Sequence, residues 1–231
     1  MLSLNGKRIL VVGATGAFGA EFCNQLVLAG ALVLGTASSA ESSIRLSANL
    51  HQRLLLDLRN QESVNTLAQY LLQSPEQLDG IIIASGLVAF GSISDTPLEV
   101  KNQLSQVNAT GPINLVSQLI PKLTATATAE GSPFVVSISG VIAESPMAGL
   151  AAYSSSKTAM HGFAIAAAKE LKKLGIRWLD ARPGHTESGL ASRAIFGQAP
   201  NFGAGMEVTQ VVSRIVRGII DDEKDLPSTS F

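Results

Sequence analysis

The chain has 231 residues, of which 46% are hydrophobic and 15% charged, and its formal net charge is −1 at pH 7. This composition is too apolar for a disordered chain, and the near-neutral charge argues against the basic surface that nucleic-acid binding requires. A single cysteine, Cys23, excludes an internal disulfide framework and a cysteine-cluster metal site, so we expect neither a metal nor a nucleic-acid partner.

The N-terminal segment does not read as a secretory signal, because the charges at Lys7 and Arg8 stand directly before a short strand-like run. No apolar stretch approaches the roughly 20 residues that span a bilayer. We therefore expect a cytoplasmic protein with no membrane partner.

Short apolar, β-branched segments alternate with longer helical patterns along the chain. The predicted strands are 8–13, 31–36, 53–57, 80–85, 134–139 and 176–181. Their nearly continuous apolar runs are typical of parallel strands that are covered on both faces. The predicted helices are about 17–29, 41–49, 60–73, 97–124, 150–173 and 207–220. This alternation predicts an α/β fold with a doubly wound parallel sheet and helices on both faces.

No break in composition marks a linker, so we expect one domain over residues 1–231. The Ala/Thr-rich segment 124–132 is predicted to be a loop before the fifth strand. The polar segment 221–231 is predicted either to add a last short strand or to fray.

The first strand runs into the glycine-rich segment "VVGATGAFG" (11–19), which opens the first helix. Its glycines, 13, 16 and 19, are three residues apart and so differ from the G-x-G-x-x-G dinucleotide fingerprint. Glycines still permit a tight turn and the close approach of a pyrophosphate to N–H groups at a helix N-terminus. The segment predicts a phosphate-binding loop, and the alternative is a plain turn in which glycine helps packing.

This loop resembles that of the short-chain dehydrogenase/reductase family, in the variant T-G-x-x-G-x-x-G, with Val12 where threonine is usual. The resemblance implies a Rossmann-like single-domain fold. It also implies a nicotinamide dinucleotide held by Gly13, Thr15, Gly16, Phe18 and Gly19.

The end of the second predicted strand bears on which dinucleotide is bound. NAD-preferring enzymes place an acid there for the ribose hydroxyls, whereas this chain has only small and hydroxyl residues over 36–39, and Glu41 comes later. The absence of a carboxylate removes the repulsion of a 2′-phosphate, and Arg45 is the nearest base downstream. We therefore favour NADP(H) over NAD(H), bound by Thr36 and Ser38. The alternative is a polar turn that tolerates both cofactors.

Two further strand ends resemble cofactor-binding positions of the family. The resemblance implies that Asp57, with Leu58, holds the adenine amino group, although Asp57 could also cap the next helix. The fourth strand ends with Ala84, Ser85 and Gly86 in the place of the family's NNAG segment, and these residues are assigned to the cofactor as well.

The segment "AAYSSSK" (151–157) places Tyr153 and Lys157 four residues apart, on one face of a predicted helix. A phenol with a pKa of about 10 needs a fall of about three units, or about 4 kcal/mol, to act near neutrality. An ammonium about 4 Å away supplies that amount at an effective dielectric constant near 20. The pair can therefore serve as a proton-transfer device.

The pair resembles the family's active site, in which Tyr153 would exchange a proton with the substrate oxygen. Lys157 would lower the pKa of Tyr153 and bind the nicotinamide ribose, and both residues would contact the cofactor. Asn108, in "VNATG", would hold the water that relays protons to Lys157; the alternative is a hydrogen bond that kinks a long helix.

The family's catalytic serine falls on Gly140, thirteen residues before Tyr153. If the following loop carries one extra residue, Ser139 takes the role of bonding the substrate carbonyl, and this is the assignment that we favour. Otherwise Ser137, Ser145 or a water must substitute. Loss of one such donor can cost about 10²–10³ in rate.

The segment "RPGHTES" (182–188) resembles the family's P-G-x-x-x-T, with Ser188 in the place of the threonine. The resemblance assigns Pro183, Gly184, Thr186 and Ser188 to the cofactor. Residues 186–206 are predicted to form a substrate lid, rich in glycine and carrying two phenylalanines.

The order of these motifs implies an NAD(P)-dependent oxidoreductase that transfers hydride between NADP(H) and a carbonyl or secondary alcohol substrate. Two alternatives are a dinucleotide-binding regulator without turnover and an isomerase or dehydratase on the same scaffold. The serines do not form the G-x-S-x-G elbow of a hydrolase. The resemblance further implies a homodimer or homotetramer, paired through the predicted helices 97–124 and 150–173.

Overall fold

The apolar runs of the sequence form the strands of one sheet in the computed structural model, which describes residues 2–231. The strands are β1 Arg8–Val12, β2 Leu32–Ala37, β3 Gln52–Leu55, β4 Gly80–Ile83, β5 Phe134–Ile138, β6 Arg177–Ala181 and β7 Asp225–Leu226. Every residue of β1 and β4 is buried, because helices cover both faces of these central strands.

All seven strands are parallel and lie in the order β3-β2-β1-β4-β5-β6-β7. The chain moves outward from β1 to β3, returns to β4 beside β1, and then moves outward in the other direction. Ile9 of β1 is in register with Val33 of β2 on one side and with Gly80 of β4 on the other. A cleft forms where such a sheet reverses direction, at the carboxyl ends of the strands.

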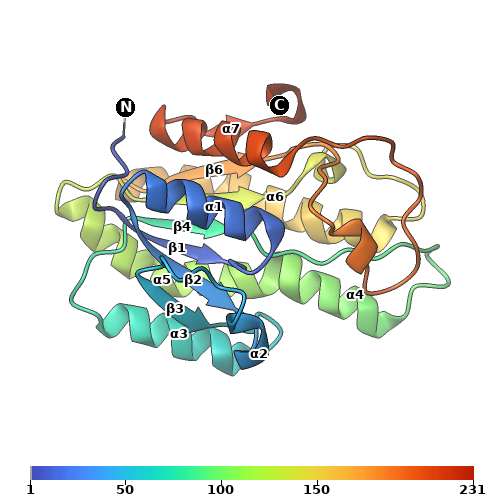
Figure 1. The fold of residues 1–231 in the computed structure, drawn as a ribbon, viewed down its shortest axis with the longest axis horizontal. Coiled ribbons are helices and arrows are strands. Elements are labelled where there is room, and N and C mark those ends of the chain that lie inside the picture. The colour runs from blue at the N-terminus through green and yellow to red at the C-terminus, as the bar shows by residue number, and fades with distance from the viewer. Residues whose placement is uncertain (1) are drawn as a thin grey trace.

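The helices cover the two faces of the sheet in separate layers (Figure 1). They are α1 Ala17–Leu28, α2 Ala40–Ser43, α3 Gln61–Gln73, α4 Leu98–Ser105, α5 Gly111–Thr128, α6 Ala151–Leu171 and α7 Val208–Ile220. α1 and α7 pack on one face, while α3, α5 and α6 pack on the other. Successive side chains along a strand point to opposite faces of the sheet, so Ile9 packs in the core on one face and Leu10 in the core on the other. The predicted doubly wound fold is confirmed.

The predicted helix 41–49 is only four residues long. Ser39 caps α2, and two serine hydroxyls bond backbone carbonyls within it: Ser42 Oγ donates to Ser39 O at 3.0 Å and Ser43 Oγ to Ala40 O at 2.6 Å. Serines that bond their own backbone favour caps and turns over helix interiors, which explains why α2 does not continue.

The predicted helix 97–124 is interrupted and longer than expected. A π-helical turn, η1 Gln106–Thr110, separates α4 from α5, and α5 continues to Thr128. The predicted loop 124–132 was therefore wrong for residues 124–128, whereas residues 129–132 do form a turn and loop before β5. Thr124 Oγ1 donates to Ile120 O at 2.9 Å, and Thr126 is fully buried with Oγ1 on Leu78 O at 2.9 Å, so these threonines are satisfied within a packed helix.

The polar segment at the C-terminus adds the short strand β7, paired with β6 through Asp180↔Asp225 and Ala181↔Leu226. One of the two predicted outcomes for residues 221–231 is therefore confirmed. Across residues 2–231, no helix combines the length and the apolar character needed to cross a bilayer.

Candidate active site

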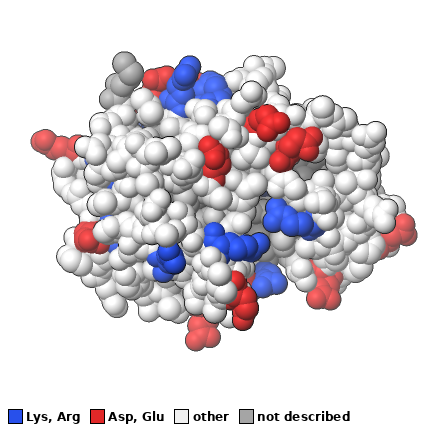
Figure 2. Space-filling model, in the orientation of Figure 1, with Lys and Arg blue, Asp and Glu red and all other residues white. Residues whose placement is uncertain are grey.

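A cleft of about 560 Å³ lies at the carboxyl ends of the strands. Figure 2 shows that basic side chains gather near the middle of this face of the molecule. Three arginines line the cleft: Arg45, Arg59 and Arg193. All of the predicted cofactor and catalytic residues line the cleft, except for Gly19 and Asn108, which support its wall.

The glycine loop joins β1 to α1 and forms one end of the cleft. Gly13 has φ +82°, and a Cβ there would lie 2.8 Å from Ser85 Cα. A Cβ on Gly19 would lie 2.1 Å from Gly13 O, so both positions require glycine. The cap residue of α1, Gly16, offers no side-chain cap, which leaves the first N–H groups of the helix available to an anion.

Thr36 of β2 holds the glycine loop in place through hydrogen bonds to its backbone. It is buried, and its Oγ1 accepts a hydrogen bond from Gly13 N at 3.0 Å while its carbonyl accepts one from Ala14 N at 3.0 Å. Ser38 and Arg45 follow at the same corner of the cleft. The side chain of Arg45 forms no ion pair and no hydrogen bond with residues 2–231.

Asp57 closes the same corner with Leu58 and Arg59. Arg59 Nε donates to Asp57 Oδ1 and Arg59 Nη2 to Asp57 Oδ2, both at 2.9 Å. These hydrogen bonds from Arg59 hold the pKa of Asp57 below its usual value and raise that of Arg59. Arg59 was missed by the sequence analysis, although it follows Asp57 closely in "DLRN".

Tyr153 and Lys157 lie one turn apart on α6, at the wall of the cleft opposite the glycine loop. Lys157 is buried, and its Nζ donates to Ile138 O at 2.8 Å. Burial lowers the pKa of Lys157 to about 8, and the negative charge of Asp180 opposes this fall. The ammonium therefore lies in a desolvated site with Asp180 as a source of negative charge.

The Tyr153 phenol has a shift opposite to the one expected from a neighbouring ammonium. Burial raises the pKa of Tyr153 to about 12, whereas the sequence argument expected a fall toward neutrality. The difference has one cause, which is that the phenol is desolvated. In this state Tyr153 keeps its proton at neutral pH.

Asn108 lies in η1, buried between the β4 end of the cleft and α6. Its Nδ2 donates to Leu87 O and to Ser156 Oγ, both at 2.9 Å, and its Oδ1 accepts from Leu87 N at 2.8 Å. The side chain thus binds the loop after β4 to α6, beside Lys157. A π-helical turn at this point matches the kink that was considered as the alternative role.

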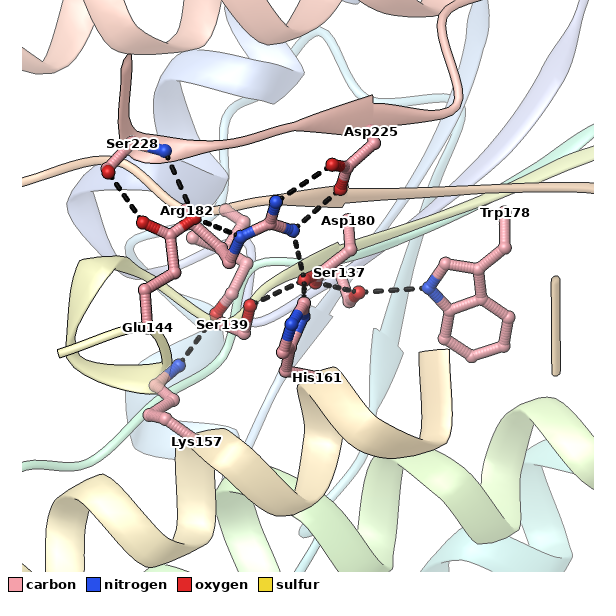
Figure 3. A network of polar contacts seen from close by, with 11 residues as sticks. Ser137, Ser139, Glu144, Lys157, His161, Trp178, Asp180, Arg182, Asp225 and Ser228 are labelled. Atoms are coloured by element: carbon pink, nitrogen blue, oxygen red, sulfur yellow. Dashed lines mark hydrogen bonds and ion pairs between the residues drawn. The ribbon is translucent and has the colours of Figure 1, made fainter. Parts of the chain in front are cut away.

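Ser139 follows β5 and has no exposed surface. Its Oγ donates to Asp180 Oδ2 at 2.6 Å (Figure 3). Gly140, in the usual place of the catalytic serine, has φ +75° and ψ 162°, a conformation that is essentially restricted to glycine. The Ser139 hydroxyl proton is therefore bonded to Asp180, and position 140 has no side chain.

The segment after β6 forms the roof of the cleft. Pro183, Gly184, Thr186 and Ser188 all line it, and Thr186 Oγ1 donates to Gly184 O at 3.0 Å. The predicted lid 186–206 contains one short helical turn, Ala191–Arg193, and is pinned to the loop after β4. Ile195 N donates to Val88 O at 3.0 Å and Phe90 N to Phe196 O at 2.9 Å.

Apolar side chains form the lid end of the cleft and were mostly missed by the sequence analysis. Val88, Phe90, Ile142 and Leu150 are buried together, with Tyr153, Leu190 and Phe202 packed against them. Apart from Tyr153 on α6, these residues come from three separate loops, so no local sequence pattern could bring them together. The cleft therefore has a polar end at the glycine loop and an apolar end beyond Tyr153.

Comparisons with known proteins agree with this geometry. The family model described as short chain dehydrogenase matches residues 7–195. The chain is 27% identical to a "Dehydrogenase/reductase SDR family protein 7-like" of Anopheles gambiae, covering 96% of this chain and 75% of the relative. It is 32% identical to a rhamnolipid-biosynthesis 3-oxoacyl-[acyl-carrier-protein] reductase of Pseudomonas aeruginosa, covering 73% and 68%.

Solved structures share the fold. A short-chain dehydrogenase from Streptomyces avermitilis superposes with a TM-score of 0.84 at 24% identity, covering 98% of this chain and 90% of that one. A short chain dehydrogenase from Burkholderia cenocepacia, solved in complex with NADP, superposes with a TM-score of 0.83 at 18% identity, covering 98% and 89%.

Proposed function

Because the chain belongs to the short chain dehydrogenase family, we propose that it transfers hydride between NADP(H) and a carbonyl compound or secondary alcohol, with Tyr153 as the acid or base. The observation that carries this proposal is the position of Tyr153 and Lys157 on α6, between the glycine loop and the apolar end of one cleft. Such a cleft accommodates a dinucleotide at one end and a substrate at the other.

The residues of the polar end fit a dinucleotide. The glycine loop leaves no room for side chains at positions 13 and 19, and Ser85 Oγ is buried without a hydrogen-bond partner among residues 2–231. A buried hydroxyl without a partner favours a bound polar ligand. The residues proposed to hold the cofactor are Gly13, Thr15, Gly16, Phe18, Gly19, Thr36, Ser38, Asp57, Leu58, Ala84, Ser85, Gly86, Tyr153, Lys157, Pro183, Gly184, Thr186 and Ser188.

When bound, the nicotinamide supplies the hydride to a carbonyl or accepts it from an alcohol. The chain's own residues handle the proton. Tyr153 donates its hydroxyl proton to the carbonyl oxygen during reduction and takes it back during oxidation. Lys157 holds the ribose and stabilises the phenolate left behind. Asn108 keeps the loop after β4 in contact with α6, so that Lys157 and Tyr153 stay in place.

The phenol already carries the proton that carbonyl reduction requires. Burial raises the pKa of Tyr153 to about 12, so the phenol is an acid with its proton in place at neutral pH. Alcohol oxidation instead needs the phenolate, which would have to form beside the Lys157 ammonium. With NADPH as the cofactor, we propose that the protein works as a carbonyl reductase.

Arginines support NADP(H) as the cofactor. Arg45 and Arg59 line the corner of the cleft that follows β2 and β3, beside Ser38. Arg45 has no ion-pair partner among residues 2–231, whereas Arg59 is bound to Asp57. A free guanidinium beside a serine hydroxyl is suited to a phosphate monoester, and a plain ribose would leave it unused. We propose that Arg45 contacts the 2′-phosphate.

The apolar end of the cleft supports an uncharged, hydrophobic substrate. Phe90, Ile142, Leu150 and Phe202 surround the space beyond Tyr153. The guanidinium of Arg193 is bonded to Gly189 O and Ser188 O at 3.0 and 3.2 Å, so its charge is already partly satisfied. We propose that apolar groups flank the reacting carbonyl.

A spectrophotometric screen tests the function. NADPH and NADH are each supplied with a panel of aliphatic, aromatic and acidic ketones, and absorbance at the reduced-nicotinamide band is followed. We expect oxidation of NADPH with apolar ketones and little with acidic ones. Absence of turnover across the panel, with NADPH binding intact, would instead favour a regulator that binds the dinucleotide. The observations that favour this second candidate are the hydrogen bond of Ser139 Oγ to Asp180 and the glycine at position 140.

We also propose a homo-oligomer. α4 and α6 pack against each other, and each carries an exposed apolar side chain, with 71% of Leu98 and 48% of Ile165 accessible. Exposed apolar residues on neighbouring helices are suited to pairing with a second copy. Light scattering after gel filtration measures the mass, and a mass equal to the single chain of 24.0 kDa would contradict this proposal.

A further inference from the structure

Asp180 of β6 is the centre of a buried polar network beneath the reaction centre (Figure 3). Its side chain is 5% exposed and accepts four hydrogen bonds. The donors are Ser137 Oγ at 2.5 Å, Ser139 Oγ at 2.6 Å, His161 Nδ1 at 2.8 Å and Arg182 Nη1 at 3.1 Å. No sequence motif assigned a role to Asp180, which interrupts an otherwise apolar run after Trp178.

The network fixes where the two serine protons go. Trp178 Nε1 can only donate, and it donates to Ser137 Oγ at 2.9 Å, so the single Ser137 proton is left for Asp180 Oδ1. Ser139 likewise gives its single proton to Asp180 Oδ2. A carboxylate is a stronger acceptor than a ketone, so Asp180 competes with a substrate carbonyl for the Ser139 proton.

Lys157 and His161 approach the network from the same element, α6. Figure 3 shows Lys157 and His161 on successive turns of α6, both directed toward the ends of β5 and β6. Lys157 Nζ bonds the carbonyl of Ile138, the residue before Ser139, and His161 bonds Asp180. Asp180 is also the charged group that opposes the loss of the Lys157 charge.

The charges of the network are unequal. One guanidinium, that of Arg182, is shared by the carboxylates of Glu144, Asp180 and Asp225. Of these three carboxylates, only Asp180 is almost fully buried, whereas Glu144 and Asp225 are 26% and 59% exposed. A buried ammonium costs several kcal/mol unless an opposite charge offsets the cost, and Asp180 is the carboxylate whose charge acts on Lys157 in this way.

We propose that Asp180 is a positioning residue of the reaction centre: its carboxylate withholds the Ser139 hydroxyl from the substrate and is the buried counter-charge that keeps Lys157 an ammonium. This inference rests on the proposed role of Lys157 beside Tyr153. The carbonyl oxygen then receives its proton from Tyr153 without a serine donor. The glycine-only backbone at Gly140 agrees with this, since the usual serine position cannot hold a serine without strain.

The charged and titratable groups around Lys157 come from three elements. Tyr153 and His161 lie with Lys157 on α6. Asp180 lies in β6, and Arg182 follows this strand directly. Glu144 comes from the loop after β5 and binds Arg182. Of these, only Asp180 is both negative and almost fully buried. Removal of its charge should therefore lower the pKa of Lys157 more than removal of any exposed carboxylate.

An NMR titration of Lys157 tests the counter-charge without any substrate. Protein labelled with ¹³C at the lysine ε-carbon is titrated, and the Lys157 signal is identified by its loss in Lys157→Met. We expect a midpoint near pH 8 in the wild type. In Asp180→Asn the midpoint should fall by about one unit, equal to about 1.4 kcal/mol. The matched control is Asp225→Asn, which removes a 59% exposed carboxylate from the same Arg182 and should leave the midpoint within about 0.3 units.

An unchanged midpoint in a folded Asp180→Asn protein, or an equal fall in Asp225→Asn, overturns the proposal. If thermal denaturation shows that Asp180→Asn does not fold, Asp180→Ser removes the same charge and keeps a hydroxyl in the network. Because the titration needs no substrate, it decides the role of Asp180 even if the screen above finds no carbonyl that is reduced.

Ser139→Ala tests the other half of the proposal, with NADPH and the ketone that the wild type reduces fastest in the panel. We expect kcat to stay within about threefold, because the hydroxyl is bonded to Asp180. A loss of about 10²–10³, as expected for removal of a donor to the reacting oxygen, would overturn it and return the catalytic role to Ser139.

Discussion

At the scale of single residues, the state of Tyr153 follows from competition between burial and charge. A nearby ammonium would stabilise the phenolate, but burial destabilises it and raises the pKa of Tyr153 to about 12. The same desolvation lowers the pKa of Lys157 to about 8. The two groups therefore shift toward a neutral phenol and a weakly held lysine proton, which suits donation of a proton from Tyr153 to a carbonyl.

Tyr153→Phe should abolish carbonyl reduction while leaving the cofactor bound. Removing a general acid costs about 10²–10⁴ in kcat, whereas the dissociation constant of NADPH should change by no more than about threefold. The measurement combines steady-state kinetics with fluorescence titration of NADPH. Tyr70→Phe is the matched control, because Tyr70 is the only other tyrosine and lies exposed on α3. Full activity in Tyr153→Phe would remove the proposed mechanism.

Arg45→Gln should reduce the preference for NADPH over NADH. If the guanidinium contacts the 2′-phosphate, its loss should raise the KM for NADPH about tenfold or more, because hydrogen bonds to charged groups contribute about 1.5–3 kcal/mol. The KM for NADH should stay the same. Arg53→Gln, an exposed arginine that does not line the cleft, is the control. An equal change in the KM for NADPH and for NADH in Arg45→Gln would show that Arg45 does not contact the 2′-phosphate.

At the scale of elements, the tight packing of the glycine loop explains why its spacing matters. A Cβ on Gly19 would lie 2.1 Å from Gly13 O and 2.7 Å from Ala14 Cα, so α1 could not begin where it does. Gly162, in the middle of α6, is exposed, and a Cβ there would meet nothing within 4 Å. Substitution by alanine should therefore create a steric clash at Gly19 and none at Gly162.

Gly19→Ala should lower the thermal midpoint and weaken NADPH binding, since overpacking costs about 1–3 kcal/mol and displaces the loop. Gly162→Ala should raise stability by about 0.5–1 kcal/mol, because alanine favours a helix interior, and should leave NADPH binding as it is. Calorimetry and NADPH titration check both variants. NADPH affinity that is the same in Gly19→Ala as in the wild type would show that the loop does not hold the cofactor.

The elements also show what a single sequence can predict. The strands and the glycine loop were predictable because apolar runs, which are fully buried in β1 and β4, and a glycine-lined turn leave local signals. The interruption of 97–128 by a π-helical turn at Asn108 was not predictable in this form, because it depends on hydrogen bonds from Asn108 to Leu87 and Ser156. These partners are 21 and 48 residues away, and no local pattern reports them.

The same reasoning separates the parts of the site. Gly13, Tyr153 and Lys157 stand in short motifs, so the sequence could predict that they share one site. Ser139 and Asp180 are paired across two neighbouring strands, and the partner of the Ser139 hydroxyl could be found only from the register of β5 on β6. The apolar end of the cleft was equally hidden, because its side chains come from three loops.

At the scale of the whole molecule, one ionic cluster links the C-terminal segment to the active-site loop. Arg182 binds Asp225 of β7 through two hydrogen bonds at 2.7 and 2.9 Å, and it also binds Glu144 in the loop after β5. Glu144 in turn accepts hydrogen bonds from Ser228 Oγ at 2.5 Å and Ser228 N at 3.2 Å. The edge strand, the C-terminal turn and the loop before α6 are therefore stabilised together.

This cluster predicts that the folded state is sensitive to acid. Burial opposes ionisation of Glu144, but hydrogen bonds from Ser228 and Arg182 outweigh it and lower the pKa of Glu144. Hydrogen bonds from Arg214 and Arg59 likewise lower those of Glu223 and Asp57. A carboxyl with a lower pKa in the folded than in the unfolded state stabilises the fold above its unfolded pKa, and this contribution is lost as the pH falls through the folded value.

The thermal midpoint should therefore be nearly constant from pH 7 to about pH 5 and should fall steeply below about pH 4.5, the range of unfolded glutamates. Glu144→Gln should lower the midpoint at pH 7 by several degrees, at about 2–4 °C per kcal/mol, and should flatten the acid limb. Glu207→Gln is the control, because Glu207 is exposed and forms no ion pair with residues 2–231. Calorimetry from pH 3 to pH 8 gives both quantities. If Glu144→Gln and Glu207→Gln have the same acid limb as the wild type, the cluster does not set the acid stability of the fold.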